Sequence, residues 1–205
     1  MEESFKTLQK SASDEFEVKR SRFIGYASPV KTEEEALLFI SGIKQKHWDA
    51  KHNVYAYRLR NGGIMRFSDD GEPQGTAGMP VLNVISKEEI TDCVVVVTRY
   101  FGGILLGGGG LVRAYSHAAK LALDSAGVTV SQPWRFFRLL VPYSLYSHTQ
   151  TLVLSFDGVM CETLFSENVD ITFRIKKERA DAFLTALTDA FCGKLSCETL
   201  GDKIL

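Results

Sequence analysis

The sequence has no excess of basic charge. Its 205 residues include 24 lysines and arginines against 25 aspartates and glutamates, and residues 1–130 alone hold 16 of each sign. A net charge of −1 provides no long-range field that would draw the whole protein onto nucleic acid or a membrane. Any contact with nucleic acid must therefore come from a local basic surface.

Cysteine is scarce, and its spacing is not that of a metal site. Cys93 lies beside four valines, as a small buried hydrophobic residue would. Cys192 and Cys197 are five positions apart with no histidine nearby, and the sequence contains no C-x-x-C pair. These spacings predict neither a zinc site nor a disulfide framework. We therefore expect a reduced, cytoplasmic protein.

The sequence also lacks targeting and membrane-spanning segments. Residues 1–6 are polar and acidic, without the basic and apolar regions of a signal peptide. No apolar stretch approaches the roughly 20 residues that a helix needs to cross a bilayer. With 45% hydrophobic and 24% charged residues, the composition is that of an ordinary globular protein. We therefore expect no membrane partner.

Residues 1–130 alternate between strand and helix patterns, which predicts an α+β domain. Thr32 is expected to cap a helix that ends near Lys46, because three glutamates follow it. Residues 93–98 include four consecutive valines, which indicates a strand covered on both faces. The further predictions are strand-like residues 16–30, strands at 53–59, 64–67 and 128–130, and helices at 79–86 and 111–126 with Gly127 after the last turn.

The pattern resets after residues 131–133, where we place the boundary between a domain of residues 1–130 and a domain of residues 131–205. The second part follows the order strand, helix, strand, strand, helix, strand, which is the ferredoxin-like βαββαβ arrangement. Its predicted elements are strands at 134–141, 158–165, 168–175 and 195–200, and helices at 143–156 and 178–191.

Glycine is concentrated in one segment. Six of the 17 glycines fall between residues 102 and 110, between a predicted strand and a predicted helix, with Arg99 and Arg113 on either side. Because a helix begins with unpaired N–H groups, such a segment can hold an anion. The spacing matches neither a Walker loop nor a dinucleotide fingerprint. Two interpretations stay open: a phosphate or nucleic-acid backbone site, or glycines that only let strand and helix pack closely.

A second segment carries three carboxylates, Asp69, Asp70 and Glu72, within four positions. They could bind a divalent cation or act in acid–base chemistry, although they lack EF-hand spacing. We favour a turn in which the two aspartates accept hydrogen bonds from local backbone amides and Gly71 supplies a permissive dihedral angle.

Lys51 and His52 directly precede a predicted strand. A histidine there could act as a base, a ligand or a donor to a phosphate backbone, or it could simply cap the edge of the strand. His47, His117 and His148 have no spacing typical of metal ligands, so no metal site and no cofactor are predicted.

Several of these segments, taken together, resemble the signature of the YigZ/IMPACT family. In family order they are SRFI at 21–24, HNVYAY at 52–57, DDGEP at 69–73, GTAG at 75–78 and VVVTRYFGG at 95–103, followed by LG at 106–107. The resemblance covers roughly residues 16–130 and is specific, because the spaced blocks occur in order. The βαββαβ order of the second part fits the small second domain of bacterial members.

The resemblance implies a fold and a general function. Residues 1–130 would form an α/β sandwich similar to the second domain of ribosomal protein S5. Residues 131–205 would form a ferredoxin-like domain similar to the fifth domain of elongation factor G. Family members are expected to bind nucleic acid or the ribosome and to influence translation. The resemblance brings no catalytic residue set, so it does not predict an enzyme.

Three hypotheses follow. The first is an RNA- or ribosome-binding protein whose second domain contacts RNA or a protein partner. Its candidate phosphate-contacting residues are Lys51, His52, Arg99, Gly102, Gly103, Gly107, Gly108, Gly109, Gly110 and Arg113. The second is an enzyme acting on a small phosphorylated or acidic substrate. Its acid–base group would come from the loop that contains Asp69, Asp70, Gly71, Glu72 and Thr76.

The third hypothesis is that these residues only hold the fold. Two structural observations separate the three. An internal ion pair of Arg99 with Asp70 or Glu72 would favour the structural role and weaken both site hypotheses. A single concave pocket lined by both loops would favour the enzyme.

Overall fold

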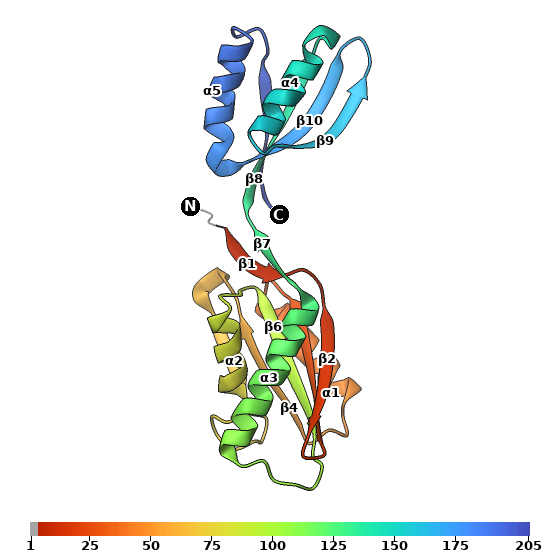
Figure 1. The fold of residues 1–205 in the computed structure, drawn as a ribbon, viewed down its shortest axis with the longest axis vertical. Helices are drawn as coiled ribbons and strands as arrows, with labels where there is room; N and C mark the ends of the chain where they lie inside the picture. Colours follow the sequence, from red (N-terminus) through yellow and green to blue (C-terminus); the bar gives the residue numbers. More distant parts are fainter. Residues whose placement is uncertain (1–3) are drawn as a thin grey trace. The chain divides into compact units, whose positions relative to one another are not determined.

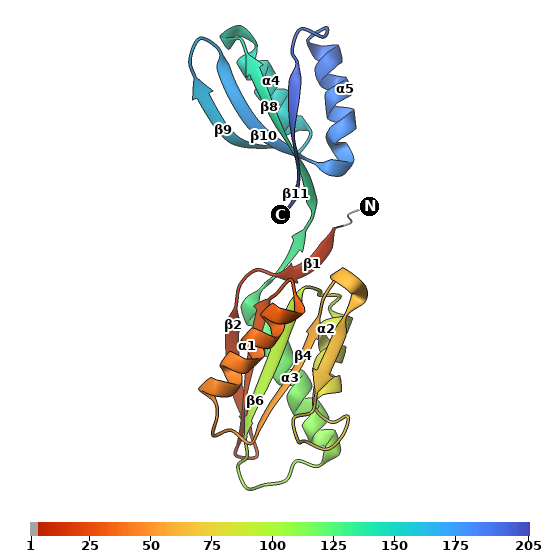
Figure 2. The same ribbon diagram turned by 180° about the vertical axis from the view of Figure 1, so that it is seen from behind.

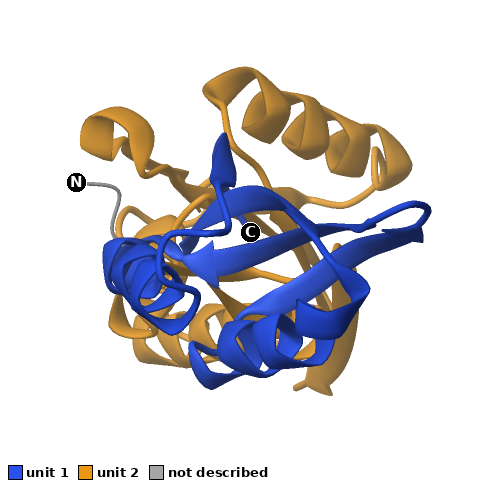
Figure 3. Cartoon of the chain, turned by 90° about the horizontal axis from the view of Figure 1, so that it is seen from above, with its two compact units in different colours: residues 1–4, 131–205 blue, residues 5–130 orange. Residues whose placement is uncertain are grey.

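The computed structural model describes residues 4–205, which fall into two compact units, residues 5–130 and residues 131–205 (Figures 1 and 3). Each unit is built around its own apolar clusters. Across residues 4–205, no helix combines the length and the apolar character that crossing a membrane requires.

The first unit is a five-stranded antiparallel sheet of order β2-β3-β6-β4-β5 between two layers of helix (Figures 1 and 2). Helix α1 covers one face, and helices α2 and α3 cover the other. The elements are β1 (Phe5–Leu8), β2 (Ala12–Val18), β3 (Ser21–Pro29), α1 (Glu33–Lys46), β4 (His52–Arg58), η1 (Asn61–Gly63), β5 (Met65–Ser68), α2 (Gly78–Lys87), β6 (Cys93–Tyr100), α3 (Gly108–Ala126) and β7 (Val128–Ser131). Strand β1 pairs with β7 in a separate two-stranded sheet.

The valine run forms the central strand β6, as the sequence predicts. Val95 and Val97 pack into the cluster under α2 and α3, whereas Val94 and Val96 pack into the cluster under α1. All four are fully buried, and burying a side chain of this size stabilises a fold by about 1.5–3 kcal/mol. The continuous apolar run therefore reflects a strand with both faces covered.

Helix α1 begins where the sequence predicts. The Thr32 side chain accepts a hydrogen bond from the backbone N–H of Glu35 at 3.2 Å, and the glutamates of the first turn lie at the positive end of the helix dipole. The prediction of Thr32 as N-cap and of an end near Lys46 is confirmed.

In the second unit the last strand spans Cys197–Ile204 rather than residues 195–200. Two boundaries of the first unit also differ from the predictions. The strand-like stretch 16–30 is divided by a two-residue turn at Lys19 and Arg20, whose φ angles are +46° and +62°. Helix α3 begins at Gly108 rather than at Leu111, and the N–H of Leu111 donates to the carbonyl of Gly107 at 2.9 Å. The sequence did not predict the turn because it lacks the usual asparagine and glycine. It did not predict the early start of α3 because glycine disfavours helix.

The second unit has the predicted βαββαβ order. Its elements are β8 (Pro133–Val141), α4 (Tyr143–Ser155), β9 (Val159–Phe165), β10 (Val169–Lys176), η2 (Lys177–Arg179), α5 (Ala180–Ala190) and β11 (Cys197–Ile204). The sheet order β11-β8-β10-β9 is that of a ferredoxin-like fold, and α4 and α5 cover one face of it (Figures 1 and 2). Phe137, Phe173 and Phe183 pack against one another at its centre.

Candidate functional site

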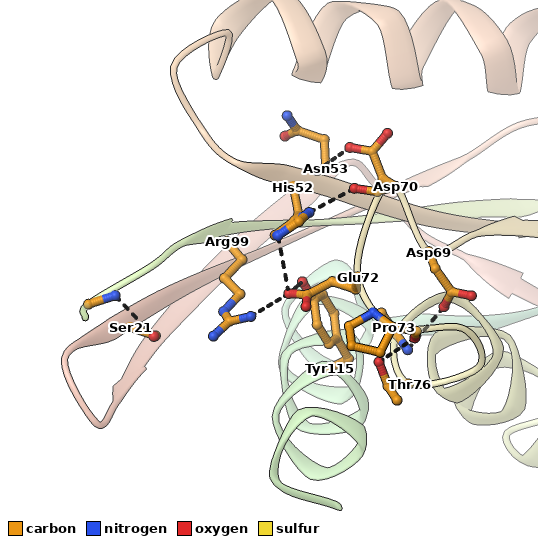
Figure 4. Close-up of polar contacts among 12 residues, drawn as sticks. Ser21, His52, Asn53, Asp69, Asp70, Glu72, Pro73, Thr76, Arg99 and Tyr115 are labelled. Atoms are coloured by element: carbon orange, nitrogen blue, oxygen red, sulfur yellow. Dashed lines mark hydrogen bonds and ion pairs between the residues drawn. The ribbon is translucent and has the colours of Figure 1, made fainter. Parts of the chain in front are cut away.

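Asp69 organises the loop that joins β5 to α2. Its carboxylate accepts hydrogen bonds from the backbone N–H groups of Gly75 at 2.9 Å, Ala77 at 3.1 Å and Gly78 at 2.8 Å (Figure 4). Helix α2 has no side-chain cap of its own at Ala77, so Asp69 satisfies the donors of its first turn. Thr76 holds the same loop by donating to the carbonyl of Pro73 at 2.6 Å. The favoured interpretation of Asp69 as a turn residue is confirmed.

Asp70 does not bond to local amides, contrary to our expectation. Its carboxylate accepts from the backbone N–H of Asn53 at 2.7 Å, and its carbonyl accepts from His52 Nδ1 at 2.7 Å (Figure 4). The carboxylate also accepts from Lys44 Nζ at 2.7 Å. The φ angle of Asp70 is +43°, and that of Gly71 is +85°. Asp70 therefore ties the loop to the start of β4 and to α1.

Glu72 is buried at the centre of a charged cluster. Its Oε1 lies 2.5 Å from Arg99 Nη1 and accepts from the Tyr115 hydroxyl at 2.8 Å (Figure 4). His52 Nε2 lies 3.8 Å from the same oxygen. The side chains of Glu72 and Arg99 are only 4% and 6% exposed. Burial, together with the Glu72 charge, raises the pKa of Tyr115, so its hydroxyl stays protonated as the donor.

The structure corrects the expected role of Arg99. Its guanidinium lies between the rings of Phe23 and Phe101, with its centre 5.4 Å from each ring centroid, and it is directed at Glu72. A buried arginine paired in this way does not reach a phosphate backbone outside the protein. This internal ion pair is the observation that favours a structural role for Arg99 and Glu72. His52, whose Nδ1 donates to Asp70, belongs to the same cluster.

The glycine segment brings the end of β6 against the β2–β3 turn. A side chain at Gly102 would place its Cβ 2.0 Å from the carbonyl carbon of Arg20, and the Gly102 N–H donates to Ser21 Oγ at 3.2 Å. Gly103 and Gly107 have φ angles of +84° and +73°. The close approach at Gly102 is therefore between the end of β6 and a hairpin turn, whereas we expected it between strand and helix. Gly108, Gly109 and Gly110 form the first turn of α3, which has no side-chain cap.

Four exposed cations gather around this segment: Lys19, Arg20, Lys51 and Arg113, which we call the cationic end. Lys19 and Arg113 line one cavity, Arg20 contacts Gly102, and Lys51 Nζ lies 5.8 Å from the centroid of the Phe101 ring. Each ion pair found within residues 4–205 involves other side chains, so these four cations have no acidic partner there.

Sequence reasoning found Lys51 and Arg113 but missed Lys19 and Arg20. The sequence signal that could have indicated them is a pair of adjacent cations between two stretches of alternating strand pattern. The cavity that Lys19 and Arg113 share is lined by no described residue of the loop between β5 and α2. Among residues 4–205, no three histidine, cysteine, aspartate or glutamate side chains gather as metal ligands would.

Comparison with known proteins agrees with this two-part architecture. The model of the Impact N-terminal domain matches residues 19–123, and that of a Domain of unknown function (DUF1949) matches residues 139–194. These matches define a protein with an IMPACT-type first domain and a small second domain. The chain belongs to the IMPACT family, and the predicted resemblance is confirmed.

Similar proteins include the "IMPACT family member YvyE" of Bacillus subtilis (strain 168), which is 38% identical over 192 residues, covering 93% of this chain and 88% of that protein. The "IMPACT family member YigZ" of Escherichia coli (strain K12) is 31% identical over 182 residues, covering 87% and 89%. A solved structure titled "Crystal structure of an hypothetical protein" has a TM-score of 0.62 and 29% identity, covering 98% of this chain and 99% of that one.

Proposed function

We propose that this protein binds RNA on the ribosome through the cationic end and thereby acts in the regulation of translation in the cytoplasm. The observation that carries the proposal is the set of four exposed cations that have no acidic partner among residues 4–205 and lie beside the start of α3, which has no side-chain cap. Family membership supports it, because the resemblance implies a link to translation. The four free cysteines suit a reducing compartment.

The local charge around the cationic end supports contact with phosphate. The three carboxylates of the neighbouring loop are occupied: Asp69 by backbone amides, Asp70 by Lys44 and a backbone amide, and Glu72 by Arg99. The cations beside them are not neutralised in the same way. Because the whole chain carries a charge of −1, binding through this surface is expected to be local and sensitive to salt.

Catalysis on a small phosphorylated substrate fits the geometry less well. Such an enzyme needs an acid–base group beside the anion site. Glu72 is buried in contact with Arg99 and Tyr115, and the cavity that Lys19 and Arg113 share is lined by no carboxylate from residues 4–205. The arrangement therefore favours binding over chemical turnover.

The second unit supplies a further contact surface in this proposal. On the sheet face opposite α4 and α5, Leu140 and Leu164 are 58% and 54% exposed on either side of Asp170 in the strand register. Asp170 is paired with Arg138, so this part of the face carries little net charge. An apolar, neutralised surface suits a protein partner better than a phosphate backbone.

Co-sedimentation with ribosomes at low and moderate salt tests the proposal. The informative variant is Lys19→Gln/Arg113→Gln, which removes two exposed charges without disturbing the buried pair. The matched control is Lys10→Gln/Lys31→Gln, because these exposed lysines follow β1 and β3 at the opposite end of the sheet from the β2–β3 turn. We expect salt-sensitive pelleting that only the first variant weakens.

The dependence of ribosome affinity on salt concentration provides a quantity that can be compared between the wild type and the two variants. Each lost phosphate contact should reduce the slope of log affinity against log salt by about one. Absence of pelleting for the wild-type protein at low salt would overturn the proposed function. Equal pelleting of the two variants would show that the contact with the ribosome lies elsewhere than at the cationic end.

A further inference from the structure

A cavity of about 300 Å³ opens between the end of β2 and the first turns of α3 in the first unit. Its lining residues are Phe16, Val18, Lys19, Leu106, Gly110, Arg113, Ala114 and His117. Binding pockets for small ligands begin at roughly 300 Å³, so this cavity suits one ring system rather than two stacked ones.

The wall of the cavity includes an aromatic ring held in a fixed orientation. Phe16 stacks on buried Phe23 with ring centroids 5.4 Å apart, and His117 meets it edge-on at 4.7 Å. Leu106 and Ala114 add apolar surface, and Gly110 contributes no side chain that would fill the space. The interior therefore offers apolar and π contacts to a flat ligand.

The rim of the cavity has the opposite character. Lys19, Arg113 and His117 are exposed, and none of the described residues that line the cavity is acidic. None of the three forms an ion pair with another residue between positions 4 and 205. An apolar aromatic interior with cations at its entrance complements a planar base attached to phosphate groups.

We propose that this cavity receives a single unstacked base of single-stranded RNA, while Lys19 and Arg113 contact the phosphates on either side of it. This inference rests on the proposed function and specifies the kind of RNA that the cationic end binds. A base enters such a cavity only when it is free of its helix stack, so loops and single strands are bound and continuous duplex is not. Arg20 and Lys51 extend the phosphate path beyond the cavity.

The test uses variants that fill the cavity without changing charge. Ala114→Met extends a side chain from α3 into it, and Leu106→Phe does so from the preceding loop. Because Ala114 is buried, the second variant keeps the test informative if the first is unstable. The matched control is Ala182→Met, an exposed position on α5.

The probes are three labelled oligonucleotides of equal length, followed by fluorescence anisotropy at low salt. They are an unstructured RNA, an RNA duplex and a single strand without bases. We expect the wild-type protein to bind the unstructured RNA most tightly. Filling the cavity should weaken that binding roughly tenfold, as the loss of one stacked base does, and leave binding of the base-free strand unchanged.

The possible failures are distinguishable. If the wild-type protein binds all three probes equally, or if both cavity-filling variants keep the preference for unstructured RNA, the base site is overturned while phosphate binding stands. If the wild-type protein binds none of the probes at low salt, the base site and the proposed function both fail.

Discussion

The two units of this protein place their charged groups in opposite ways. The first unit buries Glu72 and Arg99 in contact with each other and beside buried His52. It also buries Asn53 and Thr98, whose side chains are hydrogen-bonded to each other. Within the described part of the second unit, the only buried polar side chain is Thr149. Its arginine–carboxylate pairs lie at the surface, where Arg138 is 49% exposed.

This contrast separates two roles for the same chemical pair. Removing one partner of a buried ion pair leaves a charge without solvent or counter-charge, and the cost is large. An exposed pair is screened by water and contributes little. The first unit therefore depends on its cluster for the arrangement of its loops, while the second unit depends on apolar packing.

The largest expected effect is the loss of Glu72. Glu72→Ala should lower the free energy of unfolding of the first unit by about 3–5 kcal/mol, because Arg99 remains buried and unpaired. Arg138→Ala, the matched change in the second unit, should cost about 0–1 kcal/mol. Alkylation of Cys93 in urea measures the first unit, since burial raises the pKa of that thiol to about 12 and keeps it unreactive until the unit opens. Cys197, whose pKa burial also raises to about 12, reports the second unit.

The double variant Glu72→Met/Arg99→Met sharpens this contrast. It removes both charges and should be more stable than Glu72→Ala, because no buried charge is left unpaired. Equal costs for Glu72→Ala and Arg138→Ala would contradict the distinction between the buried and the exposed pair.

A smaller loss is expected at Asp69. Asp69→Ala removes the acceptor for three backbone N–H groups at the start of α2 and should cost about 0.5–2 kcal/mol, as the loss of a helix cap does. Asp69→Asn keeps one acceptor oxygen and should lie between this variant and the wild type. Cys93 alkylation measures both, and a wild-type value for Asp69→Ala would exclude the capping role.

The β2–β3 turn is expected to show a gain in stability. Lys19 and Arg20 both have positive φ, a conformation that costs side-chain-bearing residues roughly 1–2 kcal/mol each and that Asn-Gly adopts readily. Lys19→Asn/Arg20→Gly should raise the free energy of unfolding by about 1 kcal/mol or more and weaken ribosome pelleting.

Lys19→Gln/Arg20→Gln is the control for the turn, because it removes the charges but keeps the strained backbone. It should weaken pelleting without raising stability. A stable Asn-Gly variant that still pellets like the wild type would show that the turn's cations do not contribute to binding.

The smallest effect concerns pH and the second unit. Hydrogen bonds from Arg135 and Lys177 lower the pKa of Asp202 from 3.8 to about 2. Because the folded pKa is the lower one, this contribution is fully present above about pH 4 and is lost as the pH falls toward 2. Asp202→Asn should flatten the pH dependence in that window.

Urea unfolding followed by Trp134 fluorescence, in a background with Trp48→Phe, measures this slope for the second unit alone. The remaining slope should come from groups such as Asp170, whose pKa Arg138 also lowers. An unchanged slope in Asp202→Asn would contradict the assignment.

Much of the fold could be predicted because its signals are local. Neighbouring residues and simple periodicities determine the cap at Thr32, the valine strand β6 and the βαββαβ order. Strand β1 was missed because it is four residues long and is defined by its pairing with β7, more than a hundred positions away.

The candidate site was predicted only in part. Arg113 and Lys51 lie in the cationic end, but Arg99 is turned inward by a carboxylate 27 positions away. Lys19 and Arg20 lack the asparagine and glycine that usually mark a hairpin turn, so their exposure at its tip was not predicted. The pairing of side chains across the sheet decided which cations face solvent.

Family, strand and helix order, and the absence of a charge excess follow from the chain as written, because they depend on composition, periodicity and motif order. The tertiary structure decided the rest, through the pairing of β3 with β6 and the packing of the sheet against α3. It buried Glu72 with Arg99, brought Gly102 against Arg20, and opened a cavity between Phe16 and Arg113. These are contacts between distant segments, and their energies depend on burial, which no local pattern records.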